Sequence, residues 1–227
     1  MLRPDVKPLN ANFSSGPCAK RPNWKFEFLQ NASLGRSHRS EPSKQKLFTL
    51  IELTKEILRL PHDYILGIVP GSDTGAIELS MWNLLGPNEV SVLVWDSFSK
   101  DWANDLSNQL KISKLNIISA DYGQLPDLKN LNFKNDIIFN WNGTTSGVCV
   151  PNSDWIPNER EGLTICDATS AAFAMDIDWK KLDVATFSWQ KCLGGEGGQG
   201  MLVLSPRAVK RINSFVPEWP IPKLFQI

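Results

Sequence analysis

Two short stretches, Leu163-Thr-Ile-Cys-Asp167 and Asp183-Val-Ala-Thr-Phe-Ser-Trp-Gln-Lys191, decide the fold class of this chain. Each is an apolar, β-branched run that ends at a charged side chain. Runs that are apolar throughout are typical of strands in a parallel sheet that is covered on both faces. In such sheets the residues just beyond the strands meet at the carboxyl edge, where α/β proteins bind their ligands.

The same alternation of strands and helices extends outward over most of the chain. Apolar residues at helical spacing predict helices over residues 43–60, 76–85, 100–110 and 207–215. Strands are predicted over residues 64–70, 90–95, 115–120, 137–141, 163–166, 184–189 and 201–205. The pattern predicts an α/β fold with a mostly parallel seven-stranded sheet and helices on both faces.

Composition narrows the class of protein. The 227 residues are 42% hydrophobic and 10% aromatic, which fits a globular chain with a sizeable core. The 24 basic and 24 acidic side chains cancel, so non-specific nucleic-acid binding is not expected. We expect no membrane span and no signal peptide. Four widely spaced cysteines, without metal-ligand spacing, favour free thiols in the cytoplasm and no metal site. They are Cys18, Cys149, Cys166 and Cys192, and we expect Cys149 and Cys166 to be buried.

Three regions of different composition are expected along the chain. Residues 1–41 are rich in Pro, Ser, Asn and Gly and predict an extended arm with turns. Residues 42–215 contain the alternating strands and helices and form the main domain. Residues 216–227 are rich in Pro and aromatic residues, and we expect them to begin a linker.

Three polar segments follow predicted strands. Gly71-Ser-Asp-Thr-Gly75 lies between a strand and a helix, where small residues and a helix N-terminus suit a phosphate group. Asp167 closes a buried strand, and such a carboxylate needs a hydrogen-bonding or cationic partner. Lys191 follows another core strand, and a buried lysine amine in general is a good nucleophile. The alternatives are a capping role for the loop and for Asp167, and a solvated amine for Lys191.

A fourth segment, Gly35-Arg-Ser-His-Arg-Ser40, contains two arginines around a histidine. Arginine binds carboxylates and phosphates through two parallel hydrogen bonds, so the segment is a candidate anion site. The alternative is a solvated turn. Taken together, a phosphate loop, a strand-end aspartate and a strand-end lysine suit pyridoxal 5'-phosphate as cofactor. The lysine would bind its aldehyde carbon and the aspartate its ring nitrogen.

Five motifs resemble the phosphoserine aminotransferase family, in the branch of alphaproteobacteria and methanogenic archaea. They are Phe13-Ser-Ser-Gly-Pro17, Ser37-His-Arg-Ser40, Asn142-Gly-Thr-Thr145, Asp167-Ala-Thr-Ser170 and Trp189-Gln-Lys191. The resemblance implies the large domain of a fold-type-I transferase, a small C-terminal domain, and a homodimer with shared active sites. It also implies exchange of an amino group between phosphoserine and 2-oxoglutarate, in serine biosynthesis.

The resemblance also assigns roles to individual residues. It implies that Lys191 forms the Schiff base with the cofactor, that Asp167 pairs with the pyridine nitrogen, and that His38 and Arg39 bind the substrate. The remaining cofactor contacts would be Phe98 on the ring, with Trp95 and Trp102 as alternatives, Thr144 on the ring hydroxyl, and Ser72, Asp73, Thr74 and Gln190 on the phosphate.

Two departures from the family pattern lead to further expectations. Asp73 places an acid inside the phosphate loop, and we expect its side chain to cap the helix or to face away. Members of the family are considerably longer, and their small domain supplies another arginine for the substrate, so we expect this chain to be truncated. Another fold-type-I aminotransferase acting on serine or alanine with glyoxylate, or a non-catalytic homologue, are the alternatives. A cysteine desulfurase is disfavoured, because Phe98 stands where those enzymes usually have a histidine.

Overall fold

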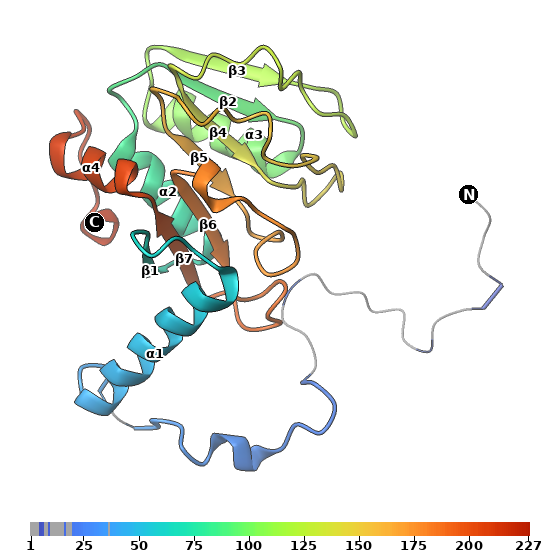
Figure 1. Cartoon of the computed structure of the whole chain (residues 1–227), viewed down its shortest axis with the longest axis vertical. Coiled ribbons are helices and arrows are strands. Elements are labelled where there is room, and N and C mark those ends of the chain that lie inside the picture. Colours follow the sequence, from blue (N-terminus) through green and yellow to red (C-terminus); the bar gives the residue numbers. More distant parts are fainter. Residues whose placement is uncertain (1–4, 7–8, 10–15, 17–19, 36) are drawn as a thin grey trace.

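The fold is organised around one seven-stranded sheet, in the order β1-β7-β6-β5-β4-β2-β3 (Figure 1). This computed structural model describes residues 5–6, 9, 16, 20–35 and 37–227. All seven predicted strands are confirmed, and only β7 runs antiparallel to its neighbours β1 and β6. The strands are β1 (Ile65–Pro70), β2 (Val90–Val94), β3 (Leu115–Ser119), β4 (Asp136–Asn140), β5 (Thr164–Asp167), β6 (Val184–Ser188) and β7 (Gln199–Leu204).

Three helices cover one face of the sheet. They are α2 (Ser72–Leu84), α3 (Ser97–Asn104), which continues in a π-helical turn (Asp105–Gln109), and α4 (Pro206–Ser214). The side chains of Leu84, Trp102 and Ala208 represent them in a core shared with Ile138 and Ile165 of the strands. The strand residues in this core pack against helices, which explains why β2, β4, β5 and β6 are buried and largely apolar.

The second face has a different cover from the helical layer that we predicted. Its core includes Trp141, Ile156, Ile177 and Trp179, which come mostly from irregular segments and from a short 3-10 helix (Trp179–Lys181). Among the described helices, α1 (Glu41–Leu58) reaches this core with Leu58 in its last turn. Indole rings and tight turns therefore cover this face of the sheet, whereas helices cover the first face.

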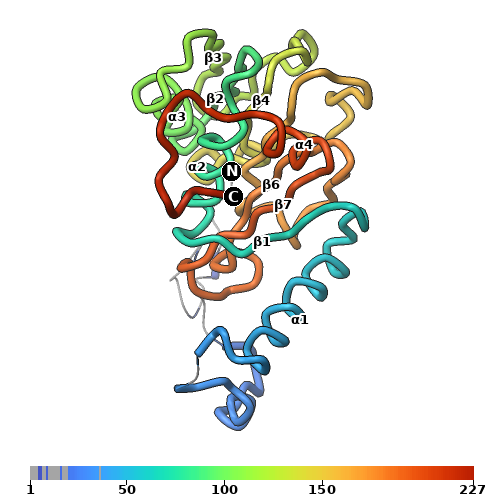
Figure 2. The backbone as a smooth tube through the Cα atoms, turned by 90° about the vertical axis from the view of Figure 1, so that its left-hand side faces the viewer, coloured from blue at the N-terminus to red at the C-terminus, as the bar shows by residue number. Residues whose placement is uncertain are grey.

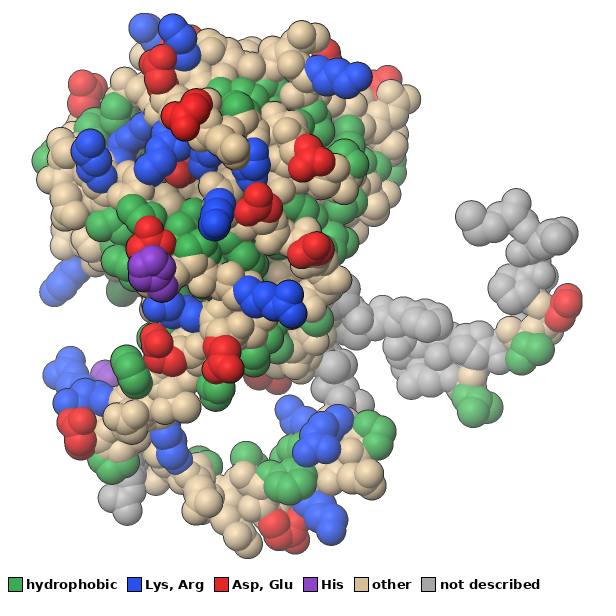
Figure 3. All heavy atoms as spheres, viewed as in Figure 1, with side chains coloured by type: hydrophobic (Ala, Val, Ile, Leu, Met, Phe, Trp, Pro, Cys, Tyr) green, Lys and Arg blue, Asp and Glu red, His purple; other side chains and the backbone are tan. Residues whose placement is uncertain are grey.

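The N-terminal region stands apart from the sheet. Helix α1 has 18 residues, about 27 Å of helix, and points away from the body of the molecule (Figures 1 and 2). Before it lies a single turn of 3-10 helix (Phe26–Leu29), and the space-filling view shows the described arm and α1 as a separate lobe below the body (Figure 3). Several apolar residues in the described part of this lobe are exposed, among them Phe26, Phe28 and Phe48.

The last twelve residues return along the sheet instead of leaving it. The indole nitrogen of Trp219 donates a hydrogen bond to the carbonyl oxygen of Trp82 on α2, at 2.9 Å. Phe225, in a short 3-10 helix (Lys223–Phe225), packs edge-on against the ring of Trp82 with the centroids 5.8 Å apart. The segment expected to be a linker is therefore anchored on α2.

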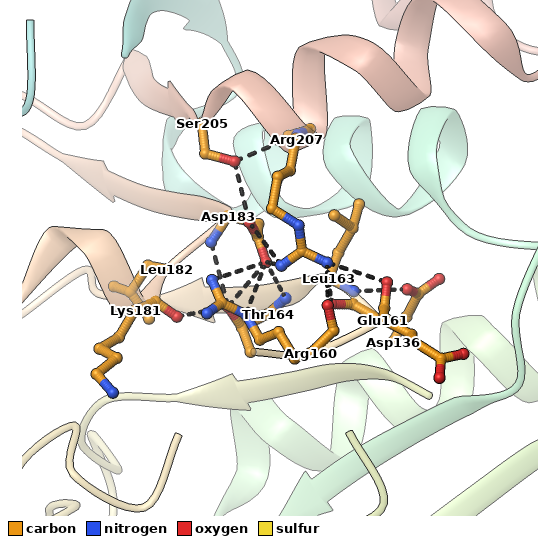
Figure 4. Close-up of polar contacts among 12 residues, drawn as sticks. Asp136, Arg160, Glu161, Leu163, Thr164, Lys181, Leu182, Asp183, Ser205 and Arg207 are labelled. Carbon is orange, nitrogen blue, oxygen red and sulfur yellow. Dashed lines mark hydrogen bonds and ion pairs between the residues drawn. The ribbon is translucent and has the colours of Figure 1, made fainter. Parts of the chain in front are cut away.

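The amino edge of the sheet is stabilised by buried ion pairs (Figure 4). Asp183 lies before β6 and accepts hydrogen bonds from Arg160, Arg207, Thr164 and Ser205, at distances of 3.0 to 3.3 Å. A carboxylate with this many donors is well compensated for its burial. The network has an architectural role, since it ties the starts of β5 and β6 to α4.

No helix among the described residues is both long enough and apolar enough to cross a membrane. Within the same residues there is no cluster of three or more side chains that would suit a metal ion. Cys166 is buried as predicted, whereas Cys149 is half-buried, and both are free thiols. Cys18 lies outside the described residues.

Candidate active site

A cavity opens at the carboxyl edge of the sheet, where α2, α3 and the turns after β4, β5 and β6 converge. All eight side chains that the sequence predicted to contact a cofactor line this cavity, and they come from five separate segments. The lining consists of Ser72, Asp73, Thr74, Phe98, Trp102, Thr144, Asp167, Thr169, Gln190 and Lys191. Thr169 is the lining residue that sequence reasoning assigned to capping alone, and Trp102 was considered only as an alternative to Phe98.

Asp167 ends β5 and is held by two donors. Its Oδ1 accepts a hydrogen bond from the backbone N–H of Thr169 at 3.0 Å, and its Oδ2 accepts one from the indole nitrogen of Trp102 at 3.3 Å. Its side chain is only 7% exposed. The capping interpretation and the functional one are thus both compatible with the geometry, because the same carboxylate closes a turn and faces the cavity.

Lys191 lies in the turn after β6 and faces the same cavity as Asp167. The turn is closed by two backbone hydrogen bonds, from Gly194 to Lys191 at 2.9 Å and from Gly195 to Trp189 at 2.8 Å. The lysine is therefore carried by a constrained turn rather than by an open loop. The two charged residues that mark the ends of β5 and β6 can contact one small molecule between them.

The predicted loop at Gly71–Gly75 is largely the first turn of α2. Gly71 and Ser72 have left-handed φ angles of 85° and 63°, and the helix begins at Ser72 rather than near residue 76. A Cβ at Gly75 would clash with the carbonyl oxygen of Pro70, and one at Gly200 with that of Ser72. The absence of these Cβ atoms allows the helix to begin pressed against the end of β1 and against β7.

The start of α2 is tied to the turn that carries Lys191. The side-chain amide of Gln190 donates a hydrogen bond to the hydroxyl of Ser72 at 3.1 Å. The backbone N–H of Gly71 donates to the carbonyl oxygen of Gly198 at 3.2 Å. These contacts fix the two sides of the cavity that were predicted to hold a phosphate and an aldehyde.

Of the two roles expected for Asp73, capping of α2 is wrong. Gly71 is the N-cap of α2 and no side chain caps it, so Asp73 does not cap the helix. Its carboxyl group is 4% exposed and faces Asp167 rather than solvent. Burial, together with the charge of Asp167, raises its pKa well above the usual range.

Buried polar atoms without a hydrogen-bond partner gather at this edge. In the part of the chain that the structure describes, there are seven such side-chain atoms. They are Asp73 Oδ1, Trp95 Nε1, Asp96 Oδ2, Asn140 Oδ1, Thr169 Oγ1, Thr186 Oγ1 and Ser188 Oγ, and all belong to the carboxyl ends of strands or to the residues beside them. Buried polar groups are normally paired, so this concentration points to a ligand site.

The three candidate aromatic residues occupy different positions. Phe98 is 38% exposed at the rim of the cavity, where a flat ligand has access to its ring. Trp102 also lines the cavity, but its indole is buried and hydrogen-bonded to Asp167. Trp95 is 2% exposed in the core and does not line the cavity.

The predicted substrate-binding pair is not brought to the cavity by this chain. His38 and Arg39 are exposed, in the turn that precedes α1, and neither lines the cavity. Arg36 and most of the motif at residues 13–17 lie outside the described residues. Helix α1, which separates this turn from the sheet, explains the distance.

Comparison with curated proteins gives close matches over the whole chain. A phosphoserine aminotransferase from Methanosarcina mazei is 60% identical over 226 residues, and one from Methanosarcina barkeri is 59% identical over the same number. Both matches cover 100% of this chain and 61% of the relative. The chain thus spans about three fifths of the length of the relatives it matches. No protein-family model matches it.

Solved structures share the same fold. A phosphoserine aminotransferase from Cytophaga hutchinsonii superposes on 79% of this chain and 50% of its own, with 25% identity and a TM-score of 0.70. A pyridoxamine–pyruvate aminotransferase from Mesorhizobium loti covers 94% of this chain and 56% of its own, with 18% identity and a TM-score of 0.76. A phosphoserine aminotransferase from Trichomonas vaginalis, solved with pyridoxal phosphate bound, covers 95% of this chain and 62% of its own, with 19% identity and a TM-score of 0.72. The fold is that of the fold-type-I aminotransferases.

Proposed function

Because the chain is a homologue of phosphoserine aminotransferases over its whole length, we propose that it binds pyridoxal 5'-phosphate and transfers an amino group between phosphoserine and 2-oxoglutarate. The proposal includes a role in serine biosynthesis in the cytoplasm. The observation that supports it best is that the eight residues to which the family resemblance assigns cofactor contacts converge on one cavity.

The cavity fits the cofactor in its hydrogen-bonding capacity. Its wall contains the buried hydroxyl oxygen Thr169 Oγ1, and the neighbouring β6 adds Thr186 Oγ1 and Ser188 Oγ, all without a hydrogen-bond partner. The amino edge of the same sheet differs, because Asp183 is there fully surrounded by donors. Buried polar groups lack partners at the carboxyl edge of the sheet but are paired at the amino edge. This difference supports ligand binding at the carboxyl edge.

Each side of the cavity suits one part of the cofactor. Lys191 would hold the aldehyde carbon and Asp167 the ring nitrogen, while Phe98 would lie against the ring. The ring hydroxyl and the phosphate would contact polar groups that line the cavity rim and the first turn of α2: Thr144, Ser72, Thr74 and Gln190. A helix N-terminus stabilises a phosphate through its free N–H groups and its dipole.

The proposed chemistry divides between the cofactor and the chain. When bound, pyridoxal phosphate supplies an electron sink that stabilises negative charge at the carbon beside the amino group. Once the substrate amine has displaced it from the aldehyde carbon, the amine of Lys191 would act as a general base. It would remove the proton from the carbon beside the amino group and deliver it to the former aldehyde carbon. Asp167 would keep the ring oriented and favour the protonated ring nitrogen.

Recognition of phosphoserine would require a second copy of the chain. His38 and Arg39 would bind the substrate phosphate and carboxylate, but within one chain they lie beyond α1 and away from the cavity. The apolar side chains Leu50 and Ile57 of α1 are 36% and 64% exposed, which suits an interface between copies. We propose a homodimer in which the arm of each copy reaches the cavity of the other.

The test of the cofactor site uses absorbance and chemical trapping. The purified chain is mixed with pyridoxal phosphate, its near-visible spectrum is recorded, and the mixture is reduced with borohydride before peptide mapping. We expect a protein-dependent spectrum and a reduced adduct on the peptide that contains Lys191. Lys191→Ala should lose both, whereas Lys210→Ala, an exposed lysine on α4, should retain both. An adduct that persists in Lys191→Ala would overturn the site.

The test of the substrate compares amino donors on the loaded chain. Conversion of the cofactor to its amino form with phosphoserine, and not with serine or alanine, supports the proposed activity. Preference for serine or alanine with glyoxylate would assign the alternative aminotransferase class. No conversion with any donor, despite cofactor binding, would indicate that the arginine expected from the small domain is required or that the chain is a non-catalytic homologue.

A further inference from the structure

Two buried carboxyl groups face each other in the wall of the cavity. Asp73 comes from the first turn of α2 and Asp167 from the end of β5, and their side chains are 4% and 7% exposed. Both line the same cavity, and Asp73 Oδ1 is buried without a hydrogen-bond partner. Two carboxylates that share a buried site cannot both ionise without a large cost, so one of them keeps a proton.

The surroundings of the pair decide which carboxyl group keeps it. Asp167 accepts a hydrogen bond from the backbone N–H of Thr169 on Oδ1 and one from the indole of Trp102 on Oδ2, so each of its oxygens already has a donor. Asp73 has no comparable backbone donor. Its side chain does not cap α2 either, because the N-cap of this helix is Gly71 and no side chain caps it. The asymmetry of donors therefore leaves the negative charge on Asp167 and the proton on Asp73.

Few charged groups face Asp73. Asp167 and Cys166 approach it from β5, and Lys191 lines the same cavity from the turn after β6. Helix α3 contributes an uncharged indole, and β6 contributes a hydroxyl group. Burial and the charge of Asp167 raise the pKa of Asp73, and the hydroxyls of Thr169 and Thr186 act more weakly in the opposite direction.

We propose that Asp73 is a positioning residue, which carries a proton at neutral pH and donates it in a hydrogen bond to Asp167. The pair then holds one negative charge, fixed on the carboxylate that faces the cavity. Asp167 thereby accepts hydrogen bonds from three donors: an indole, a backbone N–H and a carboxylic acid. The inference deepens the proposed function, because a carboxylate held in this way has one orientation toward a ring nitrogen.

The first test is infrared spectroscopy of the full chain without cofactor. A protonated carboxyl group has a carbonyl stretching band that a carboxylate lacks, and an ordinary aspartate loses this band above a pH of about 4. We expect the wild-type chain to retain one such band at pH 7. Asp73→Asn should remove it, and Asp154→Asn, which changes an exposed aspartate, should leave it in place. Absence of the band in the wild type, or its persistence in Asp73→Asn, would refute the inference.

The second test follows stability with pH and does not depend on spectroscopy. The folded chain binds a proton on Asp73 that the unfolded chain releases above a pH of about 4, so the free energy of unfolding should fall as the pH rises from there. Asp73→Asn removes the titrating group and should flatten this part of the profile relative to Asp154→Asn. Superimposable slopes in the two variants would contradict a protonated Asp73.

The third test concerns positioning in the chain loaded with pyridoxal phosphate. Asparagine still offers a donor to Asp167, whereas alanine does not. We therefore expect the Kd for the cofactor to rise by about tenfold in Asp73→Ala, which corresponds to ~1.4 kcal/mol, and by less in Asp73→Asn. An equal loss in both would show that the donor is irrelevant. If the infrared band is present but the chain does not bind the cofactor, only the proposed function is refuted. If the chain binds the cofactor but lacks the band, only this inference is refuted.

Discussion

At the scale of single residues, buried carboxylates have different surroundings at the two edges of the sheet. Asp183 is 1% exposed and paired with Arg160, whose side chain is 4% exposed, and with Arg207. Removing one member of a buried pair leaves the other charge without compensation. We expect Asp183→Ala to lower the free energy of unfolding by about 3–5 kcal/mol, measured by urea denaturation.

The matched control for Asp183 is an exposed ion pair near the same edge. Oε1 of Glu161 lies 3.8 Å from Nζ of Lys134, and the two side chains are 72% and 73% exposed. Solvent screens such pairs, so Glu161→Ala should cost less than about 1 kcal/mol. Losses of similar size in both variants would show that burial does not set the strength of the Asp183 network.

The sequence was sufficient to expect Lys191 and Asp167 at one cavity, because a charge that closes a buried strand is unusual and requires a reason. Whether they bind a cofactor stays a prediction. The left-handed φ at Ser72, where α2 begins earlier than predicted, could not be expected, because non-glycine residues seldom adopt that conformation. Thr169 was interpreted only as a capping residue, since nothing in its sequence context distinguishes a hydroxyl that also faces a cavity.

At the scale of elements, the start of α2 depends on close approach of backbone. Any side chain at Gly75 would clash with the carbonyl oxygen of Pro70, which is backbone and cannot rotate away. Gly75→Ala should therefore displace the first turn of α2 and lower the free energy of unfolding by about 1–3 kcal/mol. The same displacement should weaken binding of pyridoxal phosphate, measured by absorbance titration.

A second glycine in the same region provides the control for Gly75. A Cβ at Gly198 would meet no atom within 4 Å, and this glycine does not have a left-handed φ. Gly198→Ala should leave the free energy of unfolding within about 1 kcal/mol of the wild type. If both alanine variants were equally stable, the close contact between α2 and β1 would not be required for folding.

The elements themselves were predictable, but not all of their relations. The strands were found because short apolar runs alternate with helical periodicity. The direction of β7 was not predicted, although the sequence offers a signal. Parallel neighbours need a crossover of a dozen or more residues, usually a helix, and only residues 189–198 separate β6 from β7. A short connection rich in glycine therefore favours the antiparallel pairing that the structure has.

At the scale of the whole molecule, the lobe formed by the described arm and α1 is the least explained by the chain alone. The apolar spacing of α1 was correctly predicted to form a helix. Four of its apolar residues, Leu47, Leu50, Leu53 and Ile57, share one side of the helix and are 36–64% exposed. Sequence periodicity shows that a face is apolar, but it does not show whether the same chain covers it.

The proposed homodimer makes this face the interface, and charge substitution tests it. Leu50→Asp combined with Ile57→Asp places two carboxylates on the apolar side of α1, where they would have to be buried without partners in a dimer. We expect the wild-type chain to sediment as a dimer and this variant as a monomer in analytical ultracentrifugation. Gln45→Asp adds a carboxylate at an exposed position of α1 that faces away from Leu50 and Ile57, and it should leave the dimer intact. A wild-type chain that is monomeric at all concentrations, or a dimer that survives the Leu50 and Ile57 substitutions, would require another route for His38 and Arg39 to reach a cavity.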